Sequence, residues 1–109
     1  MTLETPSGLV DFGYLESFAA GDAGVVAEVL QLYRGEAETW LGKLDPADPS
    51  WGDVVHTIKG ASRGIGAFAL GDLCAQAEAL GPSGLAAVTA GLKATVAEIA
   101  AYQAARSLA

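Results

Sequence analysis

The sequence is poor in cysteine, in basic residues and in aromatic residues. Cysteine occurs once, at Cys74, which excludes an intramolecular disulfide and a cysteine-rich metal site. Six basic residues stand against 13 acidic ones, and the net charge of −7 disfavours binding to nucleic acid or to anionic membranes. Aromatic residues make up only 7% of the chain, whereas hydrophobic residues make up 51%. Alanine, leucine and valine must therefore supply most of the core, which favours close-packed helices.

The sequence also lacks targeting and nucleotide-binding signals. Residues 1–6 have neither the basic nor the apolar stretch of a signal peptide. No apolar run approaches the roughly 18 residues that cross a bilayer, and the glycine-rich Gly-Lys-Ser/Thr pattern of ATP-binding loops is absent. We therefore expect one soluble, cytoplasmic domain over residues 1–109 that does not phosphorylate itself from ATP.

Apolar residues recur every three or four positions along most of the chain, which is the pattern of helices with one buried face. Capping residues and prolines divide this pattern, and no segment shows the two-residue period of a strand. Because the connections are short, neighbouring helices should run antiparallel. The predicted fold is an all-α, antiparallel up-down-up-down four-helix bundle with a short extra N-terminal helix, and we expect a monomer. We predict the short helix over about residues 11–20 and the bundle helices over about 22–44, 49–69, 70–80 and 83–107.

His56 is the only histidine, and the helical wheel places it on the outer face of the predicted helix 49–69. With Ile58 at the centre of the buried face, a step of 100° per residue puts His56 about 160° away. Lys59 and Arg63 lie one and two turns beyond it, and together they form a positive patch that could hold the oxygens of a phosphoryl group. An ordinary solvated helix face would also place a histidine and two cations in this way.

Glycine interrupts the same helix at Gly60, Gly64 and Gly66, although each glycine in a helix interior costs about 1 kcal/mol relative to alanine. Gly60 lies one turn from His56 on the outer face, where it removes side-chain bulk beside the imidazole. We infer that the backbone of a partner approaches His56 there, whereas close packing within the bundle explains Gly66. Ala67 falls on the same outer face as Gly60.

The residues from His56 to Glu78 form a motif that extends over two predicted helices. It reads His56-Thr57-Ile58-Lys59-Gly60-Ala61-Ser62, then Gly66-Ala67, Leu70, Cys74 and Glu78. This motif resembles that of the histidine phosphotransfer (HPt) domain, which is His-x-Leu-Lys-Gly-x-Ser, then Gly-Ala, Leu, Cys and an acidic or amide residue on the next helix. Ile58 in place of leucine and Ala77 in place of a larger apolar residue are mild departures, and neither touches the chemistry.

The resemblance implies that the chain relays a phosphoryl group between receiver-domain aspartates through a phosphohistidine at His56. It implies that Lys59 offsets the charge of the phosphoryl group and that Gly60 gives the receiver domain room. It also implies that Glu78 accepts a hydrogen bond from Nδ1 of His56, which leaves Nε2 free to attack the phosphorus. Two further motif residues are interpreted as packing residues: Ser62 and Cys74.

The expected partners are response-regulator receiver domains and a hybrid histidine kinase, because the resemblance implies a multistep phosphorelay. We expect no cofactor and no metal ion on this chain, since the divalent cation of the reaction belongs to the receiver domain. The receiver should dock around the histidine against Gly60, Arg63 and Ala67, with Phe12 and Leu15 of the N-terminal helix as further apolar contacts. Arg63 is an addition from the helical wheel rather than from the motif.

Three other functions are alternatives at this stage. The segment from Gly60 to Gly66 is similar to the dinucleotide-binding loop of short-chain dehydrogenases, but such a loop should follow a strand, and the Tyr-x-x-x-Lys pair of that family is missing. A sensor-kinase phosphoacceptor helix usually carries an acid directly after the histidine, where this chain has Thr57. The third alternative is a non-catalytic helical interaction module, which needs no phosphoacceptor histidine. We predict a phosphotransfer carrier rather than a stand-alone kinase.

Overall fold

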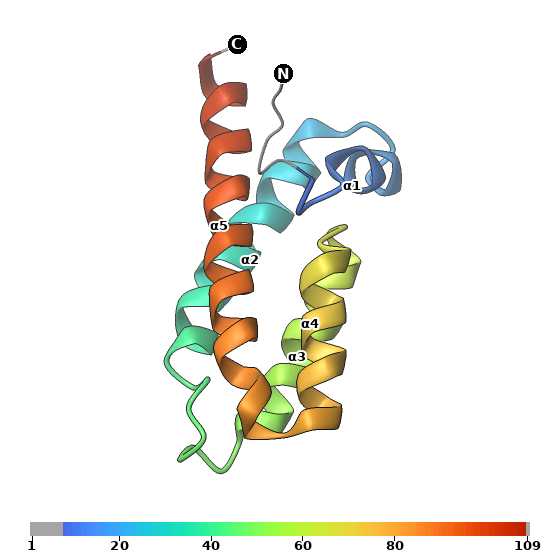
Figure 1. Cartoon of the computed structure of the whole chain (residues 1–109). Coiled ribbons are helices and arrows are strands. Elements are labelled where there is room, and N and C mark those ends of the chain that lie inside the picture. The colour runs from blue at the N-terminus through green and yellow to red at the C-terminus, as the bar shows by residue number, and fades with distance from the viewer. Residues whose placement is uncertain (1–7, 109) are drawn as a thin grey trace, which may run out of the picture.

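The computed structural model describes residues 8–108, which form five α-helices and one short 3₁₀ helix and contain no strand (Figure 1). The predicted all-α class is therefore confirmed. The expectation about a signal peptide concerns residues 1–6, which lie outside the described residues. In chain order the elements are α1 (Phe12–Phe18), α2 (Ala23–Leu41), α3 (Trp51–Gly64), α4 (Phe68–Leu80), η1 (Pro82–Gly84) and α5 (Leu85–Leu108).

Each of the four longer helices packs against two of the other three. α2 contacts α3 and α5, and α4 likewise contacts α3 and α5. In Figure 1 the pair α3 and α4 stands beside the pair α2 and α5, and α1 lies across the end of the molecule at which α5 ends. This arrangement brings α1 close to the turn between α3 and α4.

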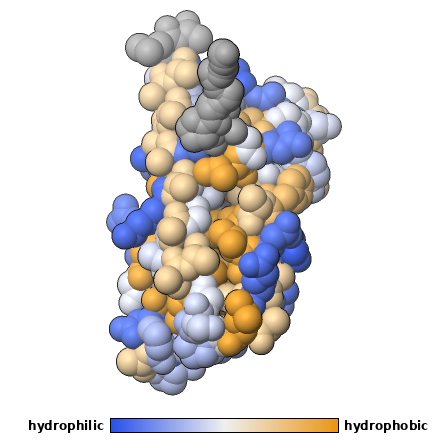
Figure 2. Space-filling model, viewed as in Figure 1, coloured by the Kyte–Doolittle hydropathy of each residue, from blue (hydrophilic) through white to orange (hydrophobic). Residues whose placement is uncertain are grey.

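The core is built mainly from aliphatic side chains, as the composition predicts. Its largest fully buried apolar members are Leu30 on α2, Ile58 on α3, Leu70 on α4, and Leu92 and Ile99 on α5. Figure 2 shows further apolar side chains along the seam between α5 and α4. Because burying one such side chain contributes about 1.5–3 kcal/mol, the core fixes the positions of α3 and α4, which carry the motif.

α3 ends at Gly64, five residues before the predicted end at 69. The chain leaves the helix at Gly66, whose φ of +91° is favourable only for glycine. The N–H of Ala67 donates to the carbonyl of Ser62 at 2.7 Å, the bond that closes a Schellman motif at a helix terminus. The prediction of one continuous helix through this point is therefore wrong.

α4 begins at Phe68, directly after this turn. Ala69, the last residue of the predicted helix 49–69, is instead an exposed residue of α4. The remaining helix ends differ from the predicted ones by at most three residues, as at Leu41, where α2 ends instead of at 44. The short helix η1 occupies the connection before α5.

α1 is held across the end of the bundle by backbone and side-chain contacts. The N–H of Asp11 donates to the carbonyl of Gly66 at 2.9 Å, which ties the start of α1 to the turn between α3 and α4. Phe12 stacks on Tyr102 of α5 with ring centroids 3.9 Å apart. The Tyr102 hydroxyl donates to Glu16 at 2.5 Å. These contacts fix α1 relative to both α5 and the motif helices.

The expectation about membrane-spanning segments needs one correction. Residues Pro82–Ser107 form a helix long enough to cross a membrane, and an 18-residue window within it is apolar enough to do so by composition. Alanine raises the hydropathy of this stretch, and its large apolar side chains Leu85, Val88, Leu92 and Ile99 are buried in the core. The stretch therefore has the one buried face of a core helix in a globular domain.

Candidate functional site

His56 lies on the outer face of α3, where the helical wheel placed it. Its side chain is 72% exposed, whereas its neighbours Val55 and Ile58 are fully buried. The buried residues fix the rotation of α3 about its axis and so direct the imidazole toward solvent. A protein partner consequently has direct access to the ring.

Glu78 of α4 binds both motif side chains that project from α3. Its Oε2 lies 3.0 Å from Nδ1 of His56, and its Oε1 lies 2.5 Å from Nζ of Lys59. The hydrogen bonds from Lys59 and then from His56 hold the pKa of the Glu78 carboxyl below its usual value. The carboxylate is therefore ionised and can only accept, so Nδ1 of His56 carries the hydrogen, and in the neutral imidazole Nε2 carries the lone pair.

The positive patch predicted around His56 is partly neutralised by acidic residues of α4. Lys59 pairs with Glu78, and Nη2 of Arg63 lies 3.4 Å from Oδ1 of Asp72. Asp72 is not among the residues predicted for the site, because its approach to Arg63 depends on the register of α3 and α4. The two ion pairs connect α3 to α4 on the same side of the molecule as His56.

Gly60 leaves open space beside the histidine. A Cβ built at this position would meet no other atom within 4 Å, and the same holds for Gly64. Packing within the chain therefore does not require glycine at either position. The absence of a side chain at Gly60 matters only for what approaches the surface from outside.

The side chains of Ser62, Tyr33 and Cys74 are buried beneath the site and belong to the core. Ser62 is fully buried, and its hydroxyl shares a hydrogen bond of 2.8 Å with the hydroxyl of Tyr33 on α2. Burial raises the pKa of Tyr33 to about 12 and that of Cys74 to about 11. Both groups consequently stay protonated near neutral pH, and the Cys74 thiol has the environment of a packing residue.

Two of the predicted docking residues are not on the surface. Ala67 is fully buried because it follows the turn at Gly66 instead of continuing α3, and Leu15 is 3% exposed because it points from α1 into the core. Phe12 is partly buried against Tyr102. The exposed large apolar side chains in this region are those of Tyr14, Phe18 and Phe68.

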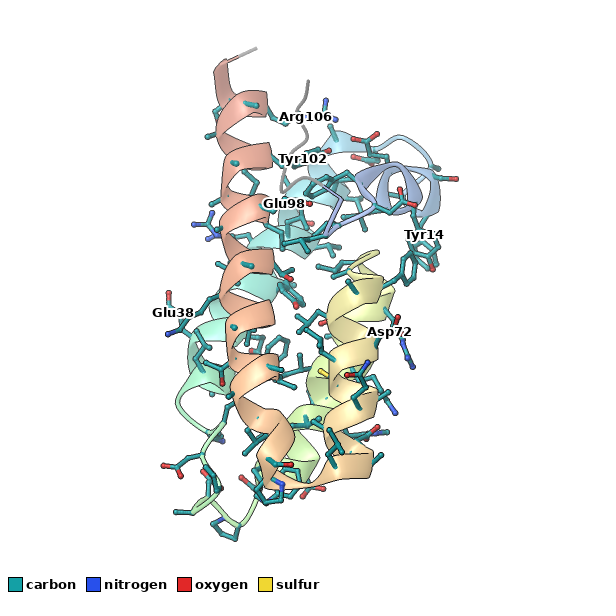
Figure 3. The ribbon with its side chains drawn as sticks, in the orientation of Figure 1. Tyr14, Glu38, Asp72, Glu98, Tyr102 and Arg106 are labelled. Carbon is teal, nitrogen blue, oxygen red and sulfur yellow. The ribbon has the colours of Figure 1, made fainter. Side chains whose placement is uncertain are left out.

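These three aromatic residues form a cluster at the end of α3 and α4. Tyr14 meets Phe68 edge to face with centroids 5.1 Å apart, and Phe18 lies 6.4 Å from Tyr14. Figure 3 shows Tyr14 and Asp72 on the same side of the molecule, Tyr14 from α1 and Asp72 from α4. An exposed apolar cluster of this kind is typical of protein-binding surfaces.

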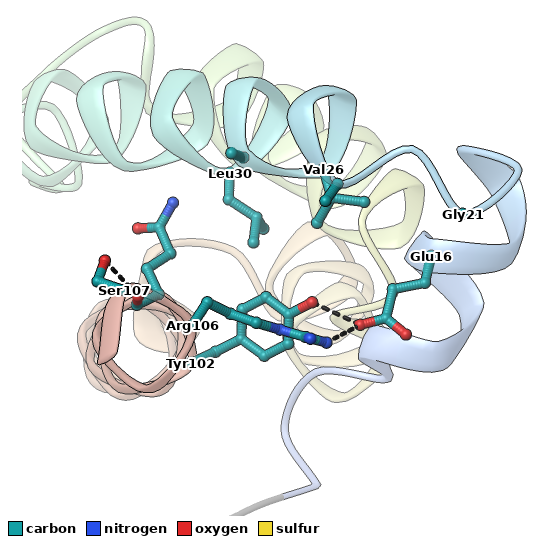
Figure 4. A pocket seen from close by; sticks show the side chains of 10 residues that line it. Glu16, Gly21, Val26, Leu30, Tyr102, Arg106 and Ser107 are labelled. Atoms are coloured by element: carbon teal, nitrogen blue, oxygen red, sulfur yellow. Dashed lines mark hydrogen bonds and ion pairs between the residues drawn. The ribbon is translucent and has the colours of Figure 1, made fainter. Parts of the chain in front are cut away.

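A cavity of about 430 Å³ lies apart from the motif, between α1, α2 and the C-terminal part of α5 (Figure 4). Val26 and Leu30 line it on one side, and Glu16, Tyr102 and Arg106 line it on the other. Arg106 lies over the Tyr102 ring and pairs with Glu16. Because these polar side chains bind one another, the cluster ties α1 to α5.

The fold and the site together define a class of protein, an all-helical carrier with an exposed histidine that a carboxylate on the next helix orients. Residues 28–105 match the Hpt domain family. The match covers more than half of the chain, so the chain belongs to the Hpt domain family.

A solved structure is similar over nearly the whole chain. The crystal structure of the histidine phosphotransferase ShpA from Caulobacter crescentus is 54% identical, with a TM-score of 0.85, and the match covers 94% of this chain and 100% of that one. No curated protein matches the sequence. The family and this likeness give the chain the function of a carrier in a histidine phosphorelay.

The dehydrogenase alternative is wrong. The segment Gly60–Gly66 is the end of α3 and the turn after it, and no strand precedes it within residues 8–108. A dinucleotide-binding loop requires a strand before the glycines and a helix that begins at them.

Proposed function

We propose that His56 is the phosphoacceptor of this carrier and that it reacts through Nε2. The observation that carries the proposal is the hydrogen bond of 3.0 Å between Nδ1 of His56 and Glu78. This bond keeps the proton on Nδ1 and leaves the lone pair on Nε2. A neutral, exposed imidazole in this tautomer is a competent nucleophile.

In the first transfer, Nε2 attacks the phosphorus of an aspartyl phosphate on a receiver domain. A P–N bond forms while the P–O bond to the aspartate breaks, and the aspartate leaves as a carboxylate. In the second transfer, an aspartate oxygen of another receiver attacks the phosphorus and His56 leaves as a neutral imidazole. Glu78 stabilises the positive charge that the ring carries while it holds the phosphoryl group.

Lys59 supplies positive charge one helical turn from His56. Its Nζ contacts Glu78 at 2.5 Å, and an ammonium group has three donors. Lys59 can therefore bind a phosphoryl oxygen while it keeps its bond to Glu78. The three side chains on α3 and α4 act as one unit in which His56 reacts, Glu78 orients and Lys59 neutralises charge.

The partners that fit this site are response-regulator receiver domains and a hybrid histidine kinase. The receiver sits over Gly60, where the surface is open, and beside Arg63. We assign the divalent cation of the reaction to the receiver domain and no cofactor to this chain. The apolar part of the docking surface is the aromatic cluster of Tyr14, Phe18 and Phe68.

The helices that hold the site form an antiparallel up-down-up-down four-helix bundle in this proposal, with α1 as the extra N-terminal helix. The contacts of α2 and α4 with both α3 and α5, and the short connection between α3 and α4, support that arrangement. Four helices that enclose one core need no second copy, so we propose that the protein acts as a monomer in the cytoplasm.

A small-molecule phosphoryl donor tests the phosphoacceptor without any partner protein. The chain is incubated with phosphoramidate, whose P–N bond breaks as ammonia leaves, and the modified residue is mapped by mass spectrometry above neutral pH. Phosphorylation of His56, and none in His56→Gln, is the expected result. Modification of another residue would contradict the assignment, and an unmodified wild-type chain would favour a non-catalytic interaction module.

A further inference from the structure

The ion pair between Arg63 and Asp72 is not used by the histidine chemistry. Arg63 follows His56 by seven residues on α3, which is about 10 Å along the helix axis at 1.5 Å per residue. The guanidinium therefore lies outside the Lys59–Glu78 network. It occupies the part of the surface over which a receiver domain seated on the histidine would extend.

Gly71 of α4 determines where the Arg63 side chain lies. A Cβ at Gly71 would be 2.7 Å from Cγ and 2.9 Å from Nε of Arg63. The stem of the arginine thus runs directly across the α4 backbone at this point. A larger residue at position 71 would force the arginine stem to move, so Gly71 allows the side chain to lie where it does.

The guanidinium is oriented but has few bonds. Its one hydrogen bond among residues 8–108 goes to Asp72, and the 3.4 Å between Nη2 and Oδ1 is long for such a bond. The side chains of Arg63 and Asp72 are 45% and 71% exposed. An exposed pair contributes little to stability, whereas the remaining donors of the fork suit a second carboxylate.

We propose that Arg63 is a specificity-determining residue that binds an acidic side chain of the receiver domain, with Gly71 and Asp72 holding it in position. The proposal rests on the phosphorelay function and on docking over His56. Arg63 does not touch the reacting atoms, so it affects the recognition of the receiver rather than the transfer step. Arginine suits this role better than lysine because its planar fork binds a carboxylate in two places.

The first test compares docking with chemistry in Arg63→Gln. Transfer is measured from the phosphorylated chain to a receiver domain that accepts the phosphoryl group from the wild-type chain. We expect the half-saturating receiver concentration to rise about two- to fivefold, as for one exposed charged contact. The maximal rate and the labelling by phosphoramidate should change by less than about twofold, and Arg63→Lys should recover part of the loss.

The second test separates the position of Arg63 from its charge. Gly71→Ala keeps the arginine and improves the helix propensity of α4, but the new Cβ displaces the arginine stem. We expect the half-saturating concentration to rise about as much as in Arg63→Gln. Gly35→Ala on α2 is the matched control, because its Cβ would meet nothing within 4 Å, and it should leave transfer unchanged.

The third test identifies the acidic partner. Arg63→Glu should weaken docking more than Arg63→Gln, and one acid-to-lysine change on the receiver should restore transfer to Arg63→Glu. Unchanged half-saturation in Arg63→Gln or in Gly71→Ala would overturn the proposal, as would a matching loss of phosphoramidate labelling. If the wild-type chain takes up a phosphoryl group neither from phosphoramidate nor from a phosphorylated receiver domain, the phosphoacceptor assignment at His56 is overturned instead.

Discussion

Nδ1 of His56 lies 3.0 Å from Oε2 of Glu78, so a carboxylate on α4 determines which nitrogen of an imidazole on α3 carries the hydrogen. The other oxygen of the same carboxylate binds Nζ of Lys59 at 2.5 Å. Glu78 therefore orients the nucleophile and holds the nearest cation. These two tasks can be separated by substitution, because His56 and Lys59 each use a different oxygen.

Replacing Glu78 with alanine should slow phosphoryl transfer by about tenfold, the effect of one lost charge-assisted hydrogen bond. The loss should be smaller than in His56→Gln, because Glu78 orients and does not react. ¹⁵N NMR of the imidazole should show a smaller fraction with the proton on Nδ1. Glu78→Gln, which keeps a hydrogen-bond acceptor, should reduce the transfer rate less than Glu78→Ala does. An unchanged tautomer of His56 in Glu78→Ala would contradict the orienting role.

The carboxyl of Glu78 should stay ionised to a lower pH than an ordinary glutamate does. Its pKa lies below the usual value because Lys59 and then His56 donate hydrogen bonds to it. A lowered pKa in the folded state stabilises the protein above the pKa of an unfolded glutamate, and this contribution disappears as the pH falls through the folded pKa. An NMR titration of the carboxyl should move to higher pH in Lys59→Gln, and an unchanged midpoint would refute this cause.

Replacing Gly60 with leucine should impair transfer from a receiver and leave the fold intact. A Cβ at this position meets nothing within 4 Å, and leucine favours a helix by about 0.8 kcal/mol over glycine. We expect the transfer rate to fall at least about tenfold and the free energy of unfolding to stay equal or increase. Gly35→Leu on α2 controls for helix propensity. A normal transfer rate in Gly60→Leu would show that the receiver does not need the open space at Gly60.

Replacing Gly66 with alanine should destabilise the protein by about 2 kcal/mol or more. Its φ is +91°, and a Cβ would lie 2.6 Å from the carbonyl oxygen of Asp11, so strain and a backbone clash add together. Urea unfolding measures the change. Gly64→Ala, two residues earlier and in open space, should be neutral or stabilising, and equal stability of the two variants would contradict this account.

The periodicity of the sequence predicts the exposed position of His56 because α3 is regular around it. The same wheel fails at Ala67, since it treats the helix as continuous past Gly66, where a positive φ ends it. Leu15 shows a different limit. Its burial depends on how α1 lies across the end of the bundle, which contacts distant in the sequence determine.

The two side-chain pairs between α3 and α4 differ in how far the sequence predicts them. The bond between His56 and Glu78 could be expected because the motif resembles a known family. The pair of Arg63 with Asp72 could not, because it depends on the axial register of two helices and on the missing side chain at Gly71. Family resemblance thus supplies the shared chemistry, and the three-dimensional structure supplies what distinguishes this chain.

The most direct test of the central claim is transfer from a receiver domain that carries labelled aspartyl phosphate, with Mg²⁺ and without ATP. Label should move to the wild-type chain in an acid-labile and alkali-stable form. It should be absent from His56→Gln, whose fold should be intact because the His56 side chain is 72% exposed. Label that persists in a folded His56→Gln chain would contradict the assignment of His56 as the phosphoacceptor.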